Sequence, residues 1–136
     1  MSDIFALQGR GSCGKSDTII GVFSELVRKY PSATVHHLSS GTHDIKVVLT
    51  NVKGQKVGIE SRGDPGSRLQ QSLRDFANAN CTIIICATRT SGMTVRWVNA
   101  MSPPYNVHFI QQVYATTNFN ASNQRVALGI IAQARL

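Results

Sequence analysis

A chain of 136 residues, 42% hydrophobic and 15% charged, has enough apolar side chains for one core and too few charges for a disordered chain. Its formal charge of +7 favours anionic partners, but no run of five basic residues marks a nucleic-acid binder. No apolar run approaches the roughly 18 residues that a membrane span needs, and no signal peptide is recognisable. One cytoplasmic domain over residues 1–136 is therefore expected.

Hydrophobic spacing predicts that strands and helices alternate along the chain. The predicted strands are 3–8, 45–51, 55–60, 82–87 and 107–114, and the predicted helices are 15–30, 68–79, 91–101 and 123–136. Residues 33–38 fit either a short strand or a loop, and the strands 45–51 and 55–60 form a hairpin around a tight turn. This order predicts an α/β three-layer sandwich, with a mostly parallel sheet of about five strands and one antiparallel hairpin.

The turn between the first strand and the first helix carries the clearest functional signal. Residues 9–16 read Gly-Arg-Gly-Ser-Cys-Gly-Lys-Ser and match the pattern G-x-x-x-x-G-K-[ST] at every fixed position. Glycines let successive N–H groups point toward an anion, and the following helix adds the positive end of its dipole. Lys15 is expected to reach the β- and γ-phosphates, and the Ser16 hydroxyl to bind Mg²⁺. The predicted phosphate-binding residues are Gly9, Arg10, Gly11, Ser12, Cys13, Gly14, Lys15, Ser16 and Asp17.

With this motif between a strand and a helix, residues 3–30 resemble the P-loop NTPase superfamily. The resemblance implies a P-loop NTPase-like fold, a nucleoside triphosphate bound with Mg²⁺, and an acidic residue at the end of a neighbouring strand that holds the metal. Glu60, which ends the second hairpin strand, and Asp64, in the loop after it, are the two candidates for this acid. Both are expected as catalytic and metal-binding residues, beside the catalytic Lys15 and the metal ligand Ser16.

The nucleobase and the reaction have weaker signals. GTPase-like members of the superfamily recognise guanine with an [NT]-K-x-D motif, whereas the matching residues here, 88–91, read Thr-Arg-Thr-Ser without an acid. ATP is therefore favoured, with GTP as the alternative. Kinase-like members use arginines to clamp the transferred phosphoryl group. Arg89 is the arginine expected in the site, and Arg96, Arg62 and Arg68 are the alternatives.

Two classes of function fit the motif. In the first, the chain is a small ATPase or kinase-like enzyme that hydrolyses the triphosphate or transfers its γ-phosphoryl group with Mg²⁺. In the second, it is a nucleotide- or anion-binding module that acts through a protein partner without catalysis, and a Glu at position 60 in place of the usual Asp permits this. Nucleic-acid association driven by the net charge is a weaker third alternative, which predicts an affinity that falls steeply with salt.

A histidine-containing segment invites a metal-site interpretation. His36, His37 and His43 lie close in the sequence to Asp44. Adjacent histidines of a strand would point to opposite faces, which prevents them from binding one ion together. A polar surface loop is therefore the preferred interpretation of this segment.

Overall fold

The computed structural model describes residues 2–11, 14–39, 43–114 and 119–136, and within them strands and helices alternate as predicted. The strands are β1 (Ser2–Gln8), β2 (Thr34–His37), β3 (Lys46–Val52), β4 (Gln55–Glu60), β5 (Ile83–Thr88) and β6 (Tyr105–Gln111). The helices are α1 (Lys15–Lys29), α2 (Leu69–Asn78), α3 (Met93–Asn99) and α4 (Phe119–Gln133). The α/β class is thereby confirmed. None of these helices is long and apolar enough to cross a bilayer.

In the described residues the strands form one six-stranded mixed sheet in the order β2-β3-β4-β5-β1-β6. β1 is parallel to both β5 and β6, and β4 is parallel to β5, whereas β3 is antiparallel to β2 and to β4. The hairpin is confirmed, but the sheet is mixed, with a second antiparallel pairing between β2 and β3, and the expected number of about five strands was too low. The additional strand is β2, a short edge strand that exposes every side chain but Val35 and so lacks the apolar pattern of a buried strand.

The last two elements begin earlier than their apolar patterns suggest. β6 covers Tyr105–Gln111 rather than 107–114, and α4 begins at Phe119 rather than at residue 123. The first turn of α4 has no buried side chain, and its first buried residue is Ala127. A helix end without an apolar face leaves no hydrophobic spacing to read, which explains the late predicted start.

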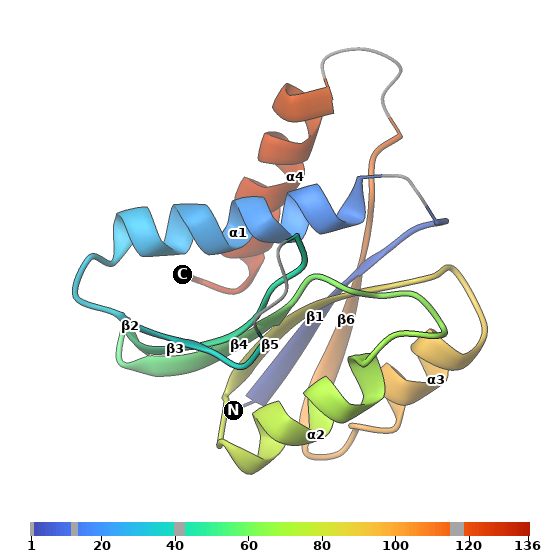
Figure 1. Cartoon of the computed structure of the whole chain (residues 1–136), viewed down its shortest axis with the longest axis horizontal. Coiled ribbons are helices and arrows are strands. Elements are labelled where there is room, and N and C mark those ends of the chain that lie inside the picture. Colours follow the sequence, from blue (N-terminus) through green and yellow to red (C-terminus); the bar gives the residue numbers. More distant parts are fainter. Residues whose placement is uncertain (1, 12–13, 40–42, 115–118) are drawn as a thin grey trace.

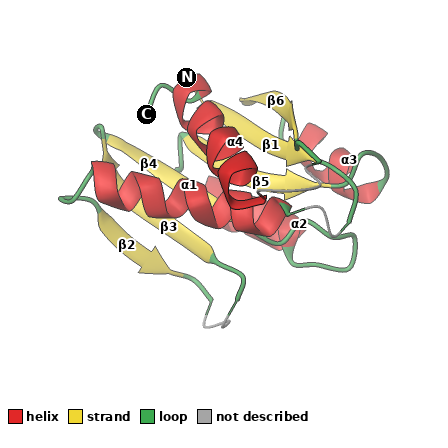
Figure 2. Cartoon of the chain, turned by 90° about the horizontal axis from the view of Figure 1, so that it is seen from above, coloured by secondary structure: helices red, strands yellow, loops and turns green. Residues whose placement is uncertain are grey.

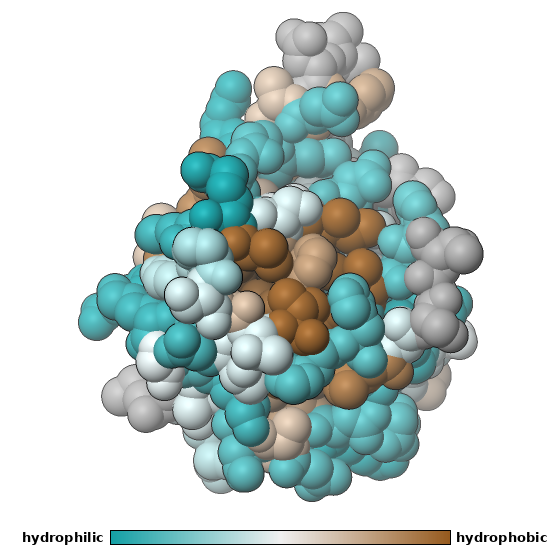
Figure 3. Space-filling model, turned by 60° about the vertical axis from the view of Figure 1, so that its left-hand side comes forward, coloured by the Kyte–Doolittle hydropathy of each residue, from teal (hydrophilic) through white to brown (hydrophobic). Residues whose placement is uncertain are grey.

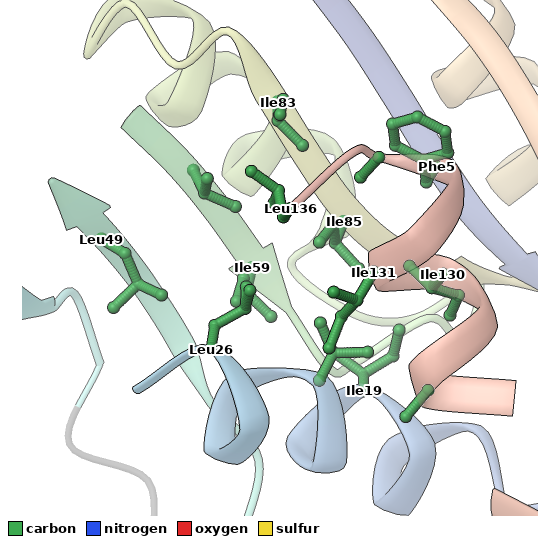
Figure 4. Close-up of a cluster of buried hydrophobic side chains, with 14 of the residues drawn as sticks. Phe5, Ile19, Leu26, Leu49, Ile59, Ile83, Ile85, Ile130, Ile131 and Leu136 are labelled. Atoms are coloured by element: carbon green, nitrogen blue, oxygen red, sulfur yellow. The ribbon is translucent and has the colours of Figure 1, made fainter. Parts of the chain in front are cut away.

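Helices cover both faces of the sheet, with α1 and α4 on one face and α2 and α3 on the other (Figures 1 and 2). Alternate strand residues serve opposite faces: Ile85 belongs to the cluster under α1 and α4, and Ile84 to the cluster over α2 and α3. In the first cluster, Ile19 and Leu26 of α1 reach Ile59 and its neighbours on the sheet (Figure 4). Some hydrophobic side chains remain at the surface, and Figure 3 shows them gathered near the centre of one face.

The carboxyl ends of the parallel strands lie along one edge of the sheet. β1, β4, β5 and β6 end there, and the antiparallel strand β3 begins there. Ligands of open α/β sheets bind outside the carboxyl ends of the strands. The loops at this edge are therefore the place where a site would form, and they include the glycine-rich turn.

Candidate functional site

The glycine-rich turn leaves β1 at the carboxyl edge and leads directly into α1. The Gly9 N–H donates to the Thr88 carbonyl at 3.1 Å, which ties the start of the turn to the end of β5. Gly14 precedes α1 with φ +87°, a left-handed conformation that glycine adopts without steric cost. A Cβ atom at this position would also lie 3.2 Å from the Asn123 amide of α4. The positive φ therefore favours glycine at this position, and a larger residue would also require the Asn123 side chain to shift.

Lys15 lies in the first turn of α1 with its ammonium directed back along the glycine-rich turn. Its Nζ donates to the carbonyl oxygens of Gly9 at 2.6 Å and of Arg10 at 2.7 Å. The residue is only 7% exposed, and a buried charge requires such partners. The structure thus places the predicted catalytic lysine against the turn. Ser12 and Cys13, also predicted to bind phosphate, lie outside the described residues.

A pocket of about 300 Å³ opens beside the N-terminus of α1. Three segments line it: the start of α1, the chain before β3, and the loop after β4. The lining residues are Gly14, Lys15, Ser16, Asp17, His43, Asp44, Ser61, Arg62, Gly63 and Asp64. Unpaired N–H groups at a helix N-terminus and a lysine side chain suit an anion, while hydroxyl and carboxylate oxygens suit a hard cation such as Mg²⁺. The structure thus brings Lys15, Ser16 and Asp64 to one pocket.

Ser16 meets a carboxylate that sequence reasoning missed. The Ser16 Oγ lies 3.2 Å from Asp44 Oδ1 and 3.2 Å from the Ser61 carbonyl oxygen. The Ser61 hydroxyl donates to the same Asp44 Oδ1 at 2.9 Å, and Arg62 Nε lies 3.7 Å from Asp44 Oδ2. Asp44 shares the polar segment that was interpreted as a surface loop. Asp44 directly precedes the predicted hairpin strand 45–51, and the pairing of that strand with 55–60 is the sequence signal that Asp44 lies near the end of β4.

Glu60 is held on the opposite face of the sheet, toward α2. Its side chain is fully buried, and it accepts hydrogen bonds from Arg68 Nε at 2.6 Å, Arg68 Nη2 at 3.2 Å and Ser72 Oγ at 2.8 Å. The hydrogen bond to Glu60 raises the pKa of the Arg68 guanidinium. Glu60 does not line the pocket beside α1. The structure therefore places this predicted metal ligand in a buried ion pair, and its role in catalysis stays a prediction.

Arg89 lies over the glycine-rich turn and is paired with Asp64. A Cβ atom built on Gly11 would come within 2.8 Å of Arg89 Nη2, so the guanidinium packs directly on the turn. Arg89 Nε and Nη2 donate to Asp64 Oδ1 at 3.1 and 3.0 Å. Two predicted catalytic residues thus form one contact. The alternative arginine of α3, Arg96, is exposed on that helix.

Polar side chains support the turn from the side of β6 and α4. Gln112, only 3% exposed, accepts a hydrogen bond from Thr18 Oγ1 at 3.2 Å and donates to Asn123 Oδ1 at 3.0 Å. The Arg10 N–H donates to the Tyr114 hydroxyl at 2.9 Å, and the Arg10 guanidinium lies 4.3 Å from the centroid of that ring. The Thr18–Gln112 and Arg10–Tyr114 contacts join residues 94 and 104 positions apart, so no local pattern in the sequence signals them.

Thr88 ends the strand between β1 and β4 with a fully buried side chain. Within the described part of the chain, its Oγ1 atom has no hydrogen-bond partner. A buried polar atom without a partner is uncommon and suits a site that takes up water or a ligand group. Thr88 is therefore a further candidate site residue at the carboxyl edge.

Comparisons with known protein families, with curated proteins and with solved structures find no match for this chain. The residues and their geometry alone therefore carry the functional argument.

Proposed function

We propose that this chain binds a nucleoside triphosphate with Mg²⁺ through residues 9–17, in the manner of P-loop NTPases, and hydrolyses it or transfers its γ-phosphoryl group. One observation carries the proposal. The complete G-x-x-x-x-G-K-[ST] motif occupies a strand–turn–helix junction at the carboxyl edge of the sheet, with Lys15 and the N-terminus of α1 beside one polar pocket.

Each side chain of the pocket has a role in this proposal. Lys15 and the N–H groups at the start of α1 bind the phosphate oxygens, and the Ser16 hydroxyl faces the metal. Arg89, which already lies against Gly11, contacts the terminal phosphate and stabilises negative charge there. The hydroxyl and carboxylate oxygens near Ser16 are the hard donors that Mg²⁺ prefers, so the residues present fit this ion. When bound, Mg²⁺ supplies charge neutralisation between the terminal phosphates.

The proposed base is adenine rather than guanine. The segment after β5, at residues 88–91, lacks the acidic residue with which GTPase-like proteins accept hydrogen bonds from guanine. We therefore expect the chain to bind ATP more tightly than GTP.

A second candidate function is nucleotide binding without turnover, with a protein partner responding to the bound state. The ion pair of Glu60 favours this candidate, since both of its carboxylate oxygens are engaged by Arg68 and one also by Ser72. A carboxylate held in this way has no lone pair prepared to activate a water. Phosphate release from Mg·ATP distinguishes the two candidates: sustained release identifies an enzyme, and binding with no release above a Lys15→Ala sample identifies a module.

Thermal unfolding with ATP, GTP or ADP, each with and without Mg²⁺, tests the proposed binding. A ligand at 100 times its Kd stabilises the folded state by about 2.7 kcal/mol. We expect Mg·ATP to raise the Tm of the wild type and to leave the Tm of Lys15→Ala unchanged, each compared with its own nucleotide-free sample. Lys56→Ala is the matched control, because Lys56 Nζ also donates to a backbone carbonyl, that of Ala79 at 2.8 Å, but far from the pocket. A wild type whose Tm does not change with any nucleotide at millimolar concentration would sink the proposal.

A further inference from the structure

We infer that Asp44, rather than Glu60 or Asp64, is the carboxylate that holds Mg²⁺ beside the Ser16 hydroxyl. The inference rests on the proposed function, because it concerns the metal that accompanies the nucleotide. It assigns the acidic ligand to the start of the antiparallel strand β3 instead of to the end of the parallel strand β4.

Three oxygen-bearing groups from three parts of the chain converge at this point. Ser16 comes from the first turn of α1, Ser61 follows β4, and Asp44 precedes β3. Asp44 Oδ1 receives the Ser61 hydroxyl at 2.9 Å and lies 3.2 Å from Ser16 Oγ. A hydroxyl and a carboxylate oxygen at hydrogen-bond distance can both turn to one hard cation placed between them. The Asp44 side chain is 28% exposed, which leaves room for the waters that Mg²⁺ retains.

The backbone pairing of the hairpin fixes the position of Asp44. The Ser61 N–H donates to the Ile45 carbonyl at 3.0 Å, and the Ile45 N–H donates to Ser61 Oγ at 2.8 Å. Ser61 therefore holds the backbone next to Asp44 and the Asp44 carboxylate at the same time. Ser61 is a positioning residue for Asp44 in this arrangement.

The other acidic residues near the turn are engaged elsewhere. Glu60 points to the α2 face, where Arg68 and Ser72 occupy its oxygens. Asp64 accepts two hydrogen bonds from Arg89 through one oxygen. Asp17 follows Ser16 and is exposed at the start of α1, where it also lines a groove against α4. Among the described carboxylates, Asp44 is the one that accepts a hydrogen bond from Ser16.

The test separates metal binding from nucleotide binding by titrating a non-hydrolysable ATP analogue in EDTA and in Mg²⁺. The measured quantity is the ratio of the two affinities for the wild type, Asp44→Asn and Asp64→Asn. Asn keeps the size of Asp and its hydrogen bond from Ser61 but loses the charge. Asp64→Asn removes the same charge from the same pocket. Removal of a group that supports a metal site costs about 10- to 100-fold in metal affinity.

We expect Asp44→Asn to bind the analogue in EDTA as tightly as the wild type or more tightly. The ratio of its affinity in Mg²⁺ to its affinity in EDTA should be at least about tenfold smaller than that of the wild type. Electron paramagnetic resonance of Mn²⁺ in the analogue complex should show the same loss of metal affinity. A full Mg²⁺ gain in Asp44→Asn, or a loss confined to Asp64→Asn, would overturn the inference and leave the proposed function standing. A wild type that binds the analogue in neither buffer would overturn the proposed function and the inference with it.

Discussion

Glu60 and Arg68 are an ion pair whose two members differ in burial: the carboxylate side chain is 0% exposed and the guanidinium side chain 26%. Removing one partner of a buried pair leaves the other charge uncompensated, which costs about 3–5 kcal/mol. We expect Arg68→Met to lower the free energy of unfolding by about 3 kcal/mol in urea titrations. Adding Glu60→Gln should restore part of this loss, because no buried charge then remains.

A second ion pair provides the control for that prediction. Arg28 and Glu25 are one helical turn apart in α1, and the Arg28 side chain is 74% exposed. Solvent screens such a pair, so Arg28→Met should change the free energy of unfolding far less than Arg68→Met. Equal effects of the two substitutions would contradict the assignment of Glu60 to a buried structural pair.

Asp64 competes with phosphate for Arg89 in the proposed site. The two side chains are 63% and 39% exposed, and pairs of this kind contribute little to stability, so the contact opens readily. We expect Asp64→Asn to strengthen binding of the ATP analogue by about two- to fivefold, the range that an exposed ion pair supports. Calorimetric titration measures this change.

Two further variants separate release of Arg89 from a general change of charge. Asp17→Asn removes the same charge from the same pocket without touching Arg89, and should have a smaller effect on binding. In an Arg89→Ala background, Asp64→Asn should bring no gain, because there is no arginine to release. A gain that persists in that background would mean that Asp64 acts on the ligand through its charge alone.

The loop after β4 depends on one close approach between elements. A Cβ atom on Gly63 would lie 2.3 Å from the Ala87 carbonyl oxygen of β5, a contact with rigid backbone. Gly63→Ala must therefore displace the loop from the sheet, and overpacking of this kind costs about 1–3 kcal/mol. We expect a lower Tm together with weaker nucleotide binding. Gly66→Ala in the same loop is the control, since nothing lies within 4 Å of its Cβ position; similar losses in both variants would contradict the packing argument.

The elements that local patterns specify well are those with a buried face or a glycine signature. The strand–turn–helix of residues 3–30, the hairpin and the doubly buried β5 were all predicted from the sequence. The sequence leaves the edge strand β2 open as either a short strand or a loop and misses the first turn of α4, because both are largely exposed and carry no apolar periodicity.

The residues of the candidate site also differ in how well local sequence predicts them. Residues 9–17 follow from a local motif, whereas the direction of the Glu60 side chain depends on which face of the sheet the end of β4 presents. Asp44 reaches Ser16 because the register of the hairpin pairs Lys46 with Glu60. Register between strands is set by long-range packing, which no short window of sequence contains. Local pattern alone therefore predicts the metal ligand at Glu60 or Asp64 rather than at Asp44.

At the scale of the whole molecule, the site depends on the complete sheet, because its parts come from segments far apart in the chain. The glycine-rich turn follows β1, Arg89 follows β5 and Gln112 follows β6, and these three strands are adjacent in the sheet. Asp44 and Ser61 enter from the other side through the hairpin. Any loss of sheet packing is therefore expected to disturb the proposed phosphate and metal contacts together.

Two buried thiols in the core cluster between the sheet and helices α2 and α3 make the free energy of unfolding depend on pH in the alkaline range. Burial raises the pKa of the Cys86 thiol to about 12 and that of Cys81 to about 11. An unfolded thiol ionises near pH 8.5, so the folded state retains protons that the unfolded state loses. Stability is therefore complete below about pH 8.5 and falls as the pH rises toward 11–12, by up to about 1.4 kcal/mol per pH unit for each buried thiol. Urea unfolding in a reducing buffer at pH 7.5, 9 and 10.5 should show a steeper decline for the wild type than for Cys86→Ala, which has no thiol to ionise at this position. Parallel declines would contradict a thiol held neutral between the sheet and its helices.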